Sequence, residues 1–321
     1  MKILITGSAG FIGFHLAKQL CHKKHKVFGI DNLDDYYDVL LKKKRLNILK
    51  KEYKNFLFQK IDIRSKKLEK FIKKNKIKII IHLAAQPGVR FSVEKPKKYF
   101  SINVEGFFNI LEASKKNKIK HLMFASSSSV YGDPKKLPMT EKASDTDKPL
   151  SFYAATKKSN EVMAHAYSNI YKIPITCLRF FTVYGPWGRP DMFFYKFLKA
   201  AFNKKLFYTF NNGKHLRDFT FIDDIVLLIE KIILKQNKTT IPYQVFNLGQ
   251  GKPIMLNSLI KNIERALGFV VKKKNRKKQK GDVESTYASS QEIIKKTNYG
   301  KFTKIELGVQ KYINWFRENN K

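Results

Sequence analysis

The sequence has few of the residues that mark secreted, membrane-spanning or metal-binding proteins. It contains two cysteines, Cys21 and Cys177, whose separation fits neither a disulfide framework nor the ligand spacing of a zinc site. No apolar run approaches the roughly 20 residues that cross a bilayer. The N-terminal segment MKILITGSAGFIG does not read as a signal peptide, because its first apolar run ends after three residues. We therefore expect a cytoplasmic protein in a reducing compartment, with no bound metal.

Acidic residues are also scarce: 26 Asp and Glu stand against 64 Lys and Arg, which gives a net charge of +38. Such a balance is typical of proteins that bind nucleic acid or another polyanion. However, only nine of the basic residues are arginines, and the lysines are spread along the whole chain. Nucleic-acid-binding proteins usually concentrate charge on one face and use arginine for bases and phosphates. We favour a solvated basic surface, and polyanion binding stays open as an alternative from a different functional class.

Short apolar runs alternate with helical patterns in the first half of the chain. The segments between the runs, such as Phe11–Lys23 and Asn103–Lys116, repeat apolar residues every three or four positions, as amphipathic helices do. This alternation predicts an α/β fold, with a doubly wound parallel sheet and right-handed crossovers. The runs themselves are rich in Ile, Val, Leu and Phe, and they predict strands at residues 3–6, 27–30, 56–61, 77–83, 121–126 and 175–180.

A glycine-rich turn follows the first predicted strand. Gly7, Gly10 and Gly13 form a GxxGxxG pattern that opens a helix. Glycines there let the backbone approach a pyrophosphate, whose charge the helix N-terminus favours. About twenty residues later the second strand ends in Asp31, where a carboxylate can accept both ribose hydroxyls of an adenosine. The pattern predicts bound NAD, because Asp31 would repel the 2′-phosphate of NADP. The alternative is a glycine-rich turn with a solvent-facing Asp.

Further cofactor contacts are expected where other strands end, since ligands bind at the carboxyl ends of parallel strands. Asp62 would meet the adenine amino group, and the small Ala84 and Ala85 would leave room for the cofactor. A purely structural role for these residues is the alternative. The full set expected to contact NAD is Gly7, Gly10, Phe11, Ile12, Gly13, Asp31, Asn32, Asp62, Ile63, Leu83, Ala84, Ala85, Asn103, Ser126, Tyr153 and Lys157.

Tyr153 and Lys157 are spaced so that they share one face of a helix. There the Lys157 ammonium would favour the ionised form of the Tyr153 phenol, whose ordinary pKa is about 10, and would make it a base at neutral pH. The serine run at 126–129, after the fifth strand, offers a hydroxyl to the same substrate oxygen. A YxxxK pair alone is common by chance, but here it follows a nucleotide motif and a strand that ends in serines.

Together these motifs resemble those of the extended short-chain dehydrogenase/reductase superfamily, which includes the nucleotide-sugar epimerases and dehydratases. The resemblance spans nearly the whole chain and is closest to the UDP-glucuronate 4-epimerases. It is carried by Gly7–Gly13, Asp31–Asp38, His82–Arg90, Ser126–Gly132, Tyr153–Lys157, Leu178–Asp191 and Arg217–Asp224.

The resemblance implies that a bound NAD is reduced and reoxidised within one turnover. Tyr153 would take the proton of the sugar 4-hydroxyl as hydride leaves C4, and the ketone would then turn over and receive the hydride on its other face. Ser127 would hydrogen-bond the reacting oxygen. Lys157 would also hold the nicotinamide ribose. These roles predict interconversion of UDP-glucuronate and UDP-galacturonate.

A glucuronate substrate forms a 4-keto acid, which loses carbon dioxide if its carboxylate bond aligns with the carbonyl π system. By resemblance, Arg189 would hold the carboxylate out of that alignment, as a bidentate guanidinium can. The alternative for Arg189 is a salt bridge to Asp191 or another carboxylate. The other expected substrate contacts are Gln86, Arg90 for carboxylate or phosphate, Ser127, Ser128, Thr182 as a supporting hydroxyl, and Arg217 and Asp282 for diphosphate and uridine.

Two serines disfavour related reactions. Ser128 and Ser129 stand where similar 4,6-dehydratases carry Asp-Glu, and similar decarboxylases carry Glu in place of Ser129, so the chain lacks the acid and base of those reactions. Pro87, Val183 and Gln279 depart from the pattern of the epimerases. A 4-epimerase of UDP-glucose or UDP-N-acetylglucosamine, or a UDP-sugar dehydratase or decarboxylase, therefore stays as an alternative.

The regular alternation ends near Phe181. We expect a Rossmann-like NAD-binding domain at 1–180, with a return of residues 218–248 through a helix and one more strand. A smaller α/β substrate-binding region would comprise 181–217 and 249–321. Apolar faces on the helices at 99–116 and 153–171 would pack against the same pair in a second subunit, as in family members, so we expect a homodimer. Core packing is the alternative for these faces.

Overall fold

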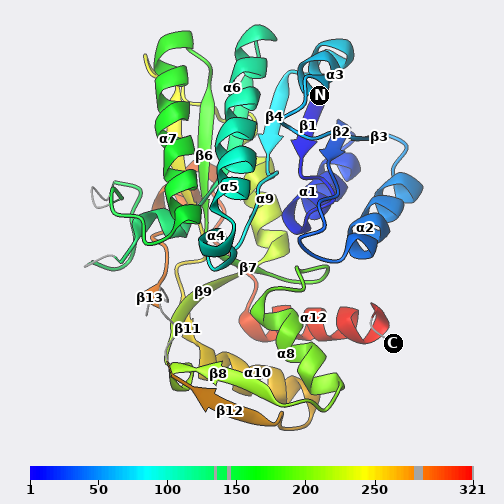
Figure 1. Ribbon diagram of the computed structural model, residues 1–321, viewed down its shortest axis with the longest axis vertical. Coiled ribbons are helices and arrows are strands. Elements are labelled where there is room, and N and C mark those ends of the chain that lie inside the picture. Colours follow the sequence, from blue (N-terminus) through cyan, green and yellow to red (C-terminus); the bar gives the residue numbers. More distant parts are fainter. Residues whose placement is uncertain (134–135, 143–145, 278–284, 320–321) are drawn as a thin grey trace.

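The computed structural model describes residues 1–133, 136–142, 146–277 and 285–319. Seven strands of this described chain form one parallel sheet in the order β10-β6-β5-β4-β1-β2-β3, with helices on both faces (Figure 1). The sheet confirms the predicted doubly wound α/β fold. Its strands are β1 (Lys2–Thr6), β2 (Lys26–Asp31), β3 (Phe56–Lys60), β4 (Ile79–His82), β5 (His121–Ser127), β6 (Ile175–Phe180) and β10 (Tyr243–Leu248).

The sheet separates two apolar cores. Alternate residues of β1 point to opposite faces, so that Ile3 and Ile5 belong to one core and Leu4 to the other, and all three are fully buried. A parallel strand buried on both faces reads as a continuous apolar run. This is why the six strands expected from such runs are all present, together with the one more strand expected within residues 218–248, which is β10. The fourth strand begins two residues late, because the amide of Ile77 bonds to the carbonyl of Ile72 at the end of the preceding helix.

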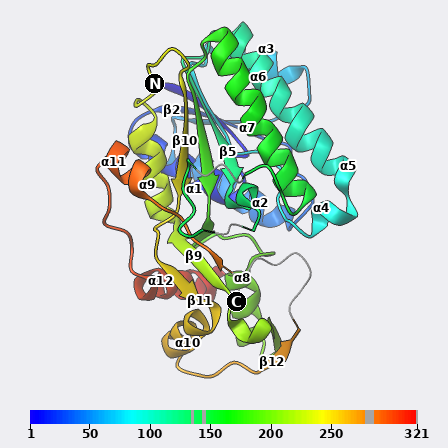
Figure 2. The ribbon, with the colours of Figure 1, turned by 90° about the vertical axis from the view of Figure 1, so that its left-hand side faces the viewer.

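Each core is covered by its own set of helices, as the side view shows (Figure 2). One face carries α1 (Phe11–His22), α2 (Val39–Glu52) and α9 (Ile222–Ile232); the other carries α3 (Lys67–Asn75), α6 (Gly106–Lys116) and α7 (Phe152–Tyr171). The helix expected at 99–116 is divided into α5 (Pro96–Tyr99), a π-helical turn η1 (Phe100–Glu105) and α6, and the short α4 (Phe91–Glu94) precedes it. No helix within the described residues is both long and apolar enough to cross a membrane.

A smaller lobe lies beyond the carboxyl edge of the main sheet (Figure 1). Its strands form a separate sheet in the order β11-β9-β13, with β7 also paired to β9, and a two-stranded pair of β8 and β12. β10 pairs with β6 in the main sheet, whereas β9, expected within the return, pairs in the small lobe. The domain limits stay a prediction. The lobe contains β7 (Thr182–Tyr184), α8 (Phe193–Phe202), β8 (Phe207–Phe210), β9 (Leu216–Phe221), β11 (Pro253–Met255), α10 (Leu256–Leu267), β12 (Lys273–Arg276), β13 (Ser285–Thr286) and α12 (Ile305–Asn319), and α11 (Gln291–Thr297) packs against α9 and β10.

Candidate active site

A cavity of about 270 Å³ lies at the carboxyl ends of the central strands. Every residue expected to contact the cofactor lines this cavity except Asn103, and so do the expected substrate residues Gln86, Ser127 and Arg189. The fold therefore brings together side chains that are up to 182 positions apart in the sequence, from Gly7 to Arg189.

The glycine turn between β1 and α1 has no room for a side chain at Gly7 or Gly13. Gly7 has a φ of +72°, and a Cβ there would lie 2.8 Å from the amide nitrogen of Ala84. A Cβ on Gly13 would collide with the carbonyl oxygen of Gly7. The turn therefore runs tightly against β4 and leaves the first turn of α1 on the cavity wall. This geometry fits a pyrophosphate group, which bare backbone amides at a helix N-terminus bind.

Asp31 ends β2 beside this turn. Its Oδ2 accepts a hydrogen bond from the amide of Ala9 (3.1 Å) and its Oδ1 one from the amide of Leu33 (2.8 Å). Only 9% of Asp31 is exposed, so a solvent-facing Asp is excluded. Burial raises the pKa of its carboxyl, against the opposing effects of these amides, Lys42 and Arg45. Each carboxylate oxygen has a second lone pair, so Asp31 fits the ribose hydroxyls of a nucleotide.

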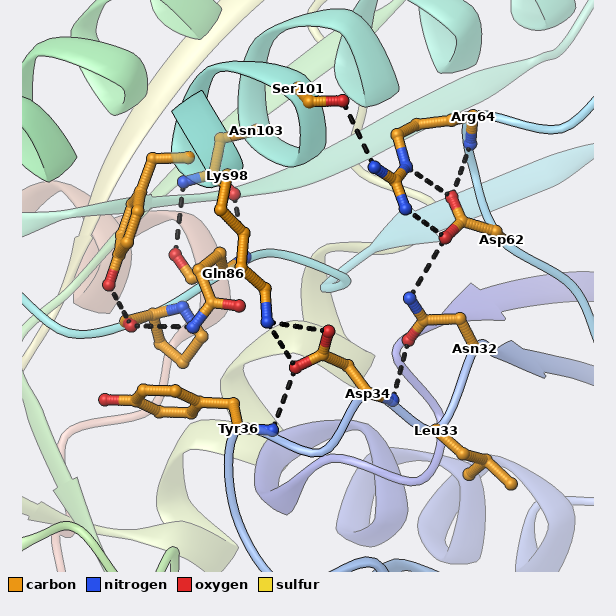
Figure 3. Close-up of polar contacts among 12 residues, drawn as sticks. Asn32, Leu33, Asp34, Tyr36, Asp62, Arg64, Gln86, Lys98, Ser101 and Asn103 are labelled. Atoms are coloured by element: carbon orange, nitrogen blue, oxygen red, sulfur yellow. Dashed lines mark hydrogen bonds and ion pairs between the residues drawn. The ribbon is translucent and has the colours of Figure 1, made fainter. Parts of the chain in front are cut away.

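Asp62, after β3, belongs to a polar cluster at the same end of the cavity (Figure 3). Arg64 donates to it from Nε (2.9 Å) and Nη2 (2.7 Å), and Asn32 donates from Nδ2 (3.1 Å). The hydrogen bonds from Arg64 outweigh the effect of burial and lower the pKa of Asp62 to about 2. The Asp62 carboxylate is therefore an ionised acceptor at neutral pH.

Tyr153 lies in the first turn of α7, which begins after Ser151, whose side chain accepts a hydrogen bond from Ala154 (3.1 Å). Burial raises the pKa of the Tyr153 phenol, while its hydrogen bond with Ser127 and the charge of Arg189 lower it. The expected effect of Lys157 on this pKa is not among these contributions. The Lys157 Nζ lies 5.9 Å from the centre of the Tyr153 ring and donates to the carbonyl of Ala125 (2.8 Å). The helix places both groups on one face, but the ammonium reaches past the ring to the end of β5.

Lys157 is a buried cation. Only 2% of it is exposed, and burial lowers the pKa of its ammonium to about 8. A group with a pKa near 8 is still mostly protonated at neutral pH, so Lys157 supplies positive charge and hydrogen-bond donors to the cavity.

The serines at 126–129 make different contacts. Ser127 lines the cavity and accepts hydrogen bonds from the amide (3.2 Å) and hydroxyl (3.0 Å) of Ser129. Ser126 also lines the cavity, but its hydroxyl donates to the carboxylate of Glu161 (2.6 Å). Ser128 is not among the lining residues. Of the four serines, Ser127 is the one whose hydrogen bond lowers the pKa of Tyr153.

Asn103 does not line the cavity but holds the backbone of Gln86, which does. It lies in the π-helical turn η1, where its Oδ1 accepts from the amide of Gln86 (2.7 Å) and its Nδ2 donates to the carbonyl of Gln86 (3.1 Å) and to Thr156 (3.1 Å). π-Helical turns occur often at functional sites. Both ends of its side-chain amide therefore hold the Gln86 backbone, and the cofactor contact expected of Asn103 stays a prediction.

Arg189 forms the salt bridge to Asp191 that is the alternative to its expected role, and its contact with a substrate carboxylate stays a prediction. It lines the cavity, and its Nε and Nη2 pair with Asp191 Oδ1 (3.0 Å) and Oδ2 (2.7 Å). Three other expected substrate residues, Arg90, Thr182 and Arg217, do not line this cavity. Arg90 is exposed, with its guanidinium 6.0 Å from the ring centre of Phe210. Thr182 pairs with Phe219 at the start of β7, and Arg217 on β9 donates to the carbonyl of Leu216 (2.9 Å). Asp282, like Gln279, falls outside the described residues.

Two buried arginines were missed by sequence reasoning. Arg179 on β6 pairs with Glu161 of α7, from Nε to Oε1 (2.9 Å) and from Nη2 to Oε2 (2.8 Å). Arg45 of α2 donates to the carbonyls of Ala9 (2.8 Å) and Trp187 (2.5 Å), so it joins the glycine turn to the loop that precedes Arg189. The sequence feature that could have identified these two buried arginines is a charged residue within an otherwise apolar strand or helix face.

Known proteins resemble this chain over its full length. The profile described as "NAD dependent epimerase/dehydratase family" matches residues 3–249. "Protein CapI" of Staphylococcus aureus is 44% identical, with 99% of each chain covered, and the "Probable UDP-glucuronate 4-epimerase" of Rhizobium meliloti is 41% identical, with 99% of this chain and 98% of that protein covered. The UDP-glucuronic acid 4-epimerase of Bacillus cereus, solved with UDP-glucuronic acid and NAD, superposes with a TM-score of 0.91 at 32% identity, with 99% of each chain covered.

The profile match includes all seven strands of the main sheet except the first residue of β1, and it also includes the glycine turn, Asp31, Tyr153 and Lys157. Sequence, fold and cavity agree, and the chain belongs to the NAD dependent epimerase/dehydratase family.

Proposed function

We propose that this protein is a UDP-glucuronate 4-epimerase, which interconverts UDP-glucuronate and UDP-galacturonate with a bound NAD. The observation that carries the proposal is that Tyr153, Ser127 and Arg189 line one cavity together with the glycine turn and Asp31. The similarity to the Rhizobium meliloti and Bacillus cereus proteins supports the same reaction.

The residues that would hold NAD fit its parts. The turn at Gly7 and Gly13 would present backbone amides to the pyrophosphate, Asp31 would accept hydrogen bonds from the adenosine ribose hydroxyls, and Lys157 would donate to the nicotinamide ribose. When bound, NAD accepts a hydride from the sugar and returns it to the opposite face.

Tyr153 is the proposed base. Once ionised, its phenolate oxygen would take the proton of the sugar 4-hydroxyl, and Ser127, which is hydrogen-bonded to Tyr153, would bind the sugar oxygen. Burial opposes ionisation of the phenol, and the positive charge of Arg189 favours it. The Lys157 ammonium adds a second positive charge to the cavity wall, 5.9 Å from the centre of the Tyr153 ring. The reverse proton transfer then completes the epimerisation.

Arg189 is the residue proposed to bind the sugar carboxylate. A guanidinium forms two parallel hydrogen bonds to a carboxylate and fixes its plane, which keeps the 4-keto acid from decarboxylating. The hydroxyl of Ser129 donates to Ser127, and neither Ser128 nor Ser129 can act as the acid or base of a dehydratase. Gln86, Thr182, Arg90, Ser128, Arg217 and Asp282 stay proposed as further substrate contacts.

The test is proton NMR of the purified protein with UDP-glucuronate and no added NAD. Anomeric signals of UDP-galacturonate should appear, and Tyr153→Phe should abolish turnover while NAD stays bound. Normal turnover in this variant would refute the mechanism. Arg189→Ala should lose the preference for UDP-glucuronate over UDP-glucose. If only UDP-glucose or UDP-N-acetylglucosamine reacts with the wild-type protein, the substrate assignment is wrong.

We further propose a cytoplasmic homodimer. Both cysteines are free and buried, as expected in a reducing compartment. Large apolar side chains on η1, α6 and α7 lie on the surface, each at least 45% exposed: Phe100, Phe108, Val162 and Ile170. Such a set on neighbouring helices is typical of an interface with a second subunit.

A further inference from the structure

Arg189 is already held along one of its edges. A guanidinium has two edges that each offer two parallel donors, one formed by Nε with a terminal nitrogen and one formed by the two terminal nitrogens. Asp191 takes the first, with Nε–Oδ1 at 3.0 Å and Nη2–Oδ2 at 2.7 Å. A substrate carboxylate that binds Arg189 in a bidentate way must therefore use the second edge, so the orientation set by Asp191 decides where that carboxylate can lie.

Asp191 is itself held by a side chain from another loop. The hydroxyl of Tyr36 donates to Asp191 Oδ2 (3.3 Å), although the two residues are 155 positions apart. Tyr36 lies in the loop after β2, which continues from Asp31, and Asp191 lies in the loop after β7. Their contact therefore joins the nucleotide side of the cavity to the side that carries Arg189.

Tyr36 has little freedom to move. A Cβ on Gly88 would lie 2.5 Å from its hydroxyl oxygen, so the loop after β4 packs directly against it. The Tyr36 ring lies 5.2 Å from the ring of Phe91, and its amide donates to Asp34 (2.9 Å), which also pairs with Lys98 (2.9 Å; Figure 3). The Tyr36 hydroxyl is thus a fixed donor, as a support for an oriented ion pair requires.

The charges agree with this arrangement. Although burial by itself raises the pKa of Asp191, its hydrogen bonds and its attraction to Arg189 hold that pKa below the ordinary value. Burial and the negative charge of Asp191 raise the pKa of Tyr36 to about 12, so its hydroxyl keeps its proton. At neutral pH the donor, the carboxylate and the guanidinium are all in the states that the contacts need.

We propose that Asp191, with Tyr36 behind it, is the positioning residue that gives this site its selectivity for a charged sugar. It orients Arg189 so that the free edge of the guanidinium binds the substrate carboxylate. This inference rests on the proposed function. A carboxylate that only neutralised Arg189 would have the opposite effect, because its removal would strengthen the binding of an anionic sugar.

The test compares Asp191→Asn and Tyr36→Phe with the wild-type holoenzyme. Calorimetry would give the dissociation constants for UDP-glucuronate and UDP-glucose, and NMR would give kcat/KM and any decarboxylated 4-ketopentose. Asp191→Asn should bind UDP-glucuronate about tenfold more weakly, as expected for a misaligned charge-assisted contact. It should bind UDP-glucose unchanged and release ketopentose. Tyr36→Phe should shift the same values in the same direction by a smaller factor, and Asp191→Glu should recover part of the loss.

Asp223→Asn is the matched control, because Asp223 is half-exposed, pairs with Lys311 (3.7 Å) and does not line the cavity. It should leave all values unchanged. The proposal is overturned if Asp191→Asn binds UDP-glucuronate as tightly as wild type or more tightly and releases no ketopentose. In that case epimerisation of UDP-glucuronate by the wild-type protein still supports the proposed function. A wild-type protein that binds both sugars alike and converts only the neutral one overturns the proposed function, and this inference with it.

Discussion

Replacing Glu161 by glutamine should lower the free energy of unfolding by about 3 to 5 kcal/mol, the range measured when one partner of a buried ion pair is removed. The Glu161 and Arg179 side chains are each only 5% exposed and are joined by two parallel hydrogen bonds. Ser126 (2.6 Å) also donates to the Glu161 carboxylate, and Cys177 contacts it through Sγ (3.4 Å). Glutamine keeps the shape but loses the charge, so the Arg179 charge stays buried without its counter-charge.

Urea unfolding of the holoenzyme, followed by tryptophan fluorescence, measures this loss. Glu69→Gln is the control, because its pair with Lys116 is about half exposed and should contribute less than about 1 kcal/mol. Removing both charges, in Glu161→Gln/Arg179→Met, should cost less than the sum of the single changes. If Glu161→Gln is as mild as Glu69→Gln, or if the double variant is fully additive, the buried pair is not a coupled unit and the reasoning fails.

The pH dependence of this loss has a defined sign. Burial raises the pKa of Glu161, but the hydrogen bonds and charge of Arg179 outweigh it, so the folded-state pKa lies below the ordinary 4.5. A carboxyl with a lowered pKa contributes stability that is present above its unfolded value and is lost as the pH falls through the folded value. The difference between wild type and Glu161→Gln should therefore be constant near neutral pH and shrink below about pH 4.5.

Two further predictions follow from burial and exposure. Because burial lowers the pKa of Lys157 to about 8, kcat should fall as the pH rises through that value. Lys157→Met should retain low activity without this fall in kcat at alkaline pH. A wild-type kcat that stays flat to about pH 10, the ordinary range of a lysine, contradicts the role of Lys157 as a catalytic cation. The exposed Val162 and Ile170 should lie in the dimer interface, so Asp at either position should give monomers in sedimentation equilibrium, whereas Asp at Leu307 of α12, which is also more than half exposed, should not. A wild-type protein that sediments as a monomer refutes the proposed dimer.

The sequence by itself determined the strands and the nucleotide turn. Strands of a parallel sheet are buried on both faces, so they are short apolar runs that can be found without knowing their neighbours. The glycines at 7 and 13 are equally local, because one needs a positive φ and the other touches the backbone six residues earlier. The spacing of Tyr153 and Lys157 follows from the helix period alone.

Only the tertiary structure decided the partners of the charged groups. Lys157 reaches the carbonyl of Ala125, Glu161 pairs with Arg179, and Asp191 meets Tyr36, across separations of 32, 18 and 155 residues. The periodicity of a sequence reports which face of an element is buried, but it carries no information on which distant residue lies opposite. The pKa of a buried group depends on that partner and on its distance, so the chemistry of this cavity is set by contacts that exist only once the chain is folded.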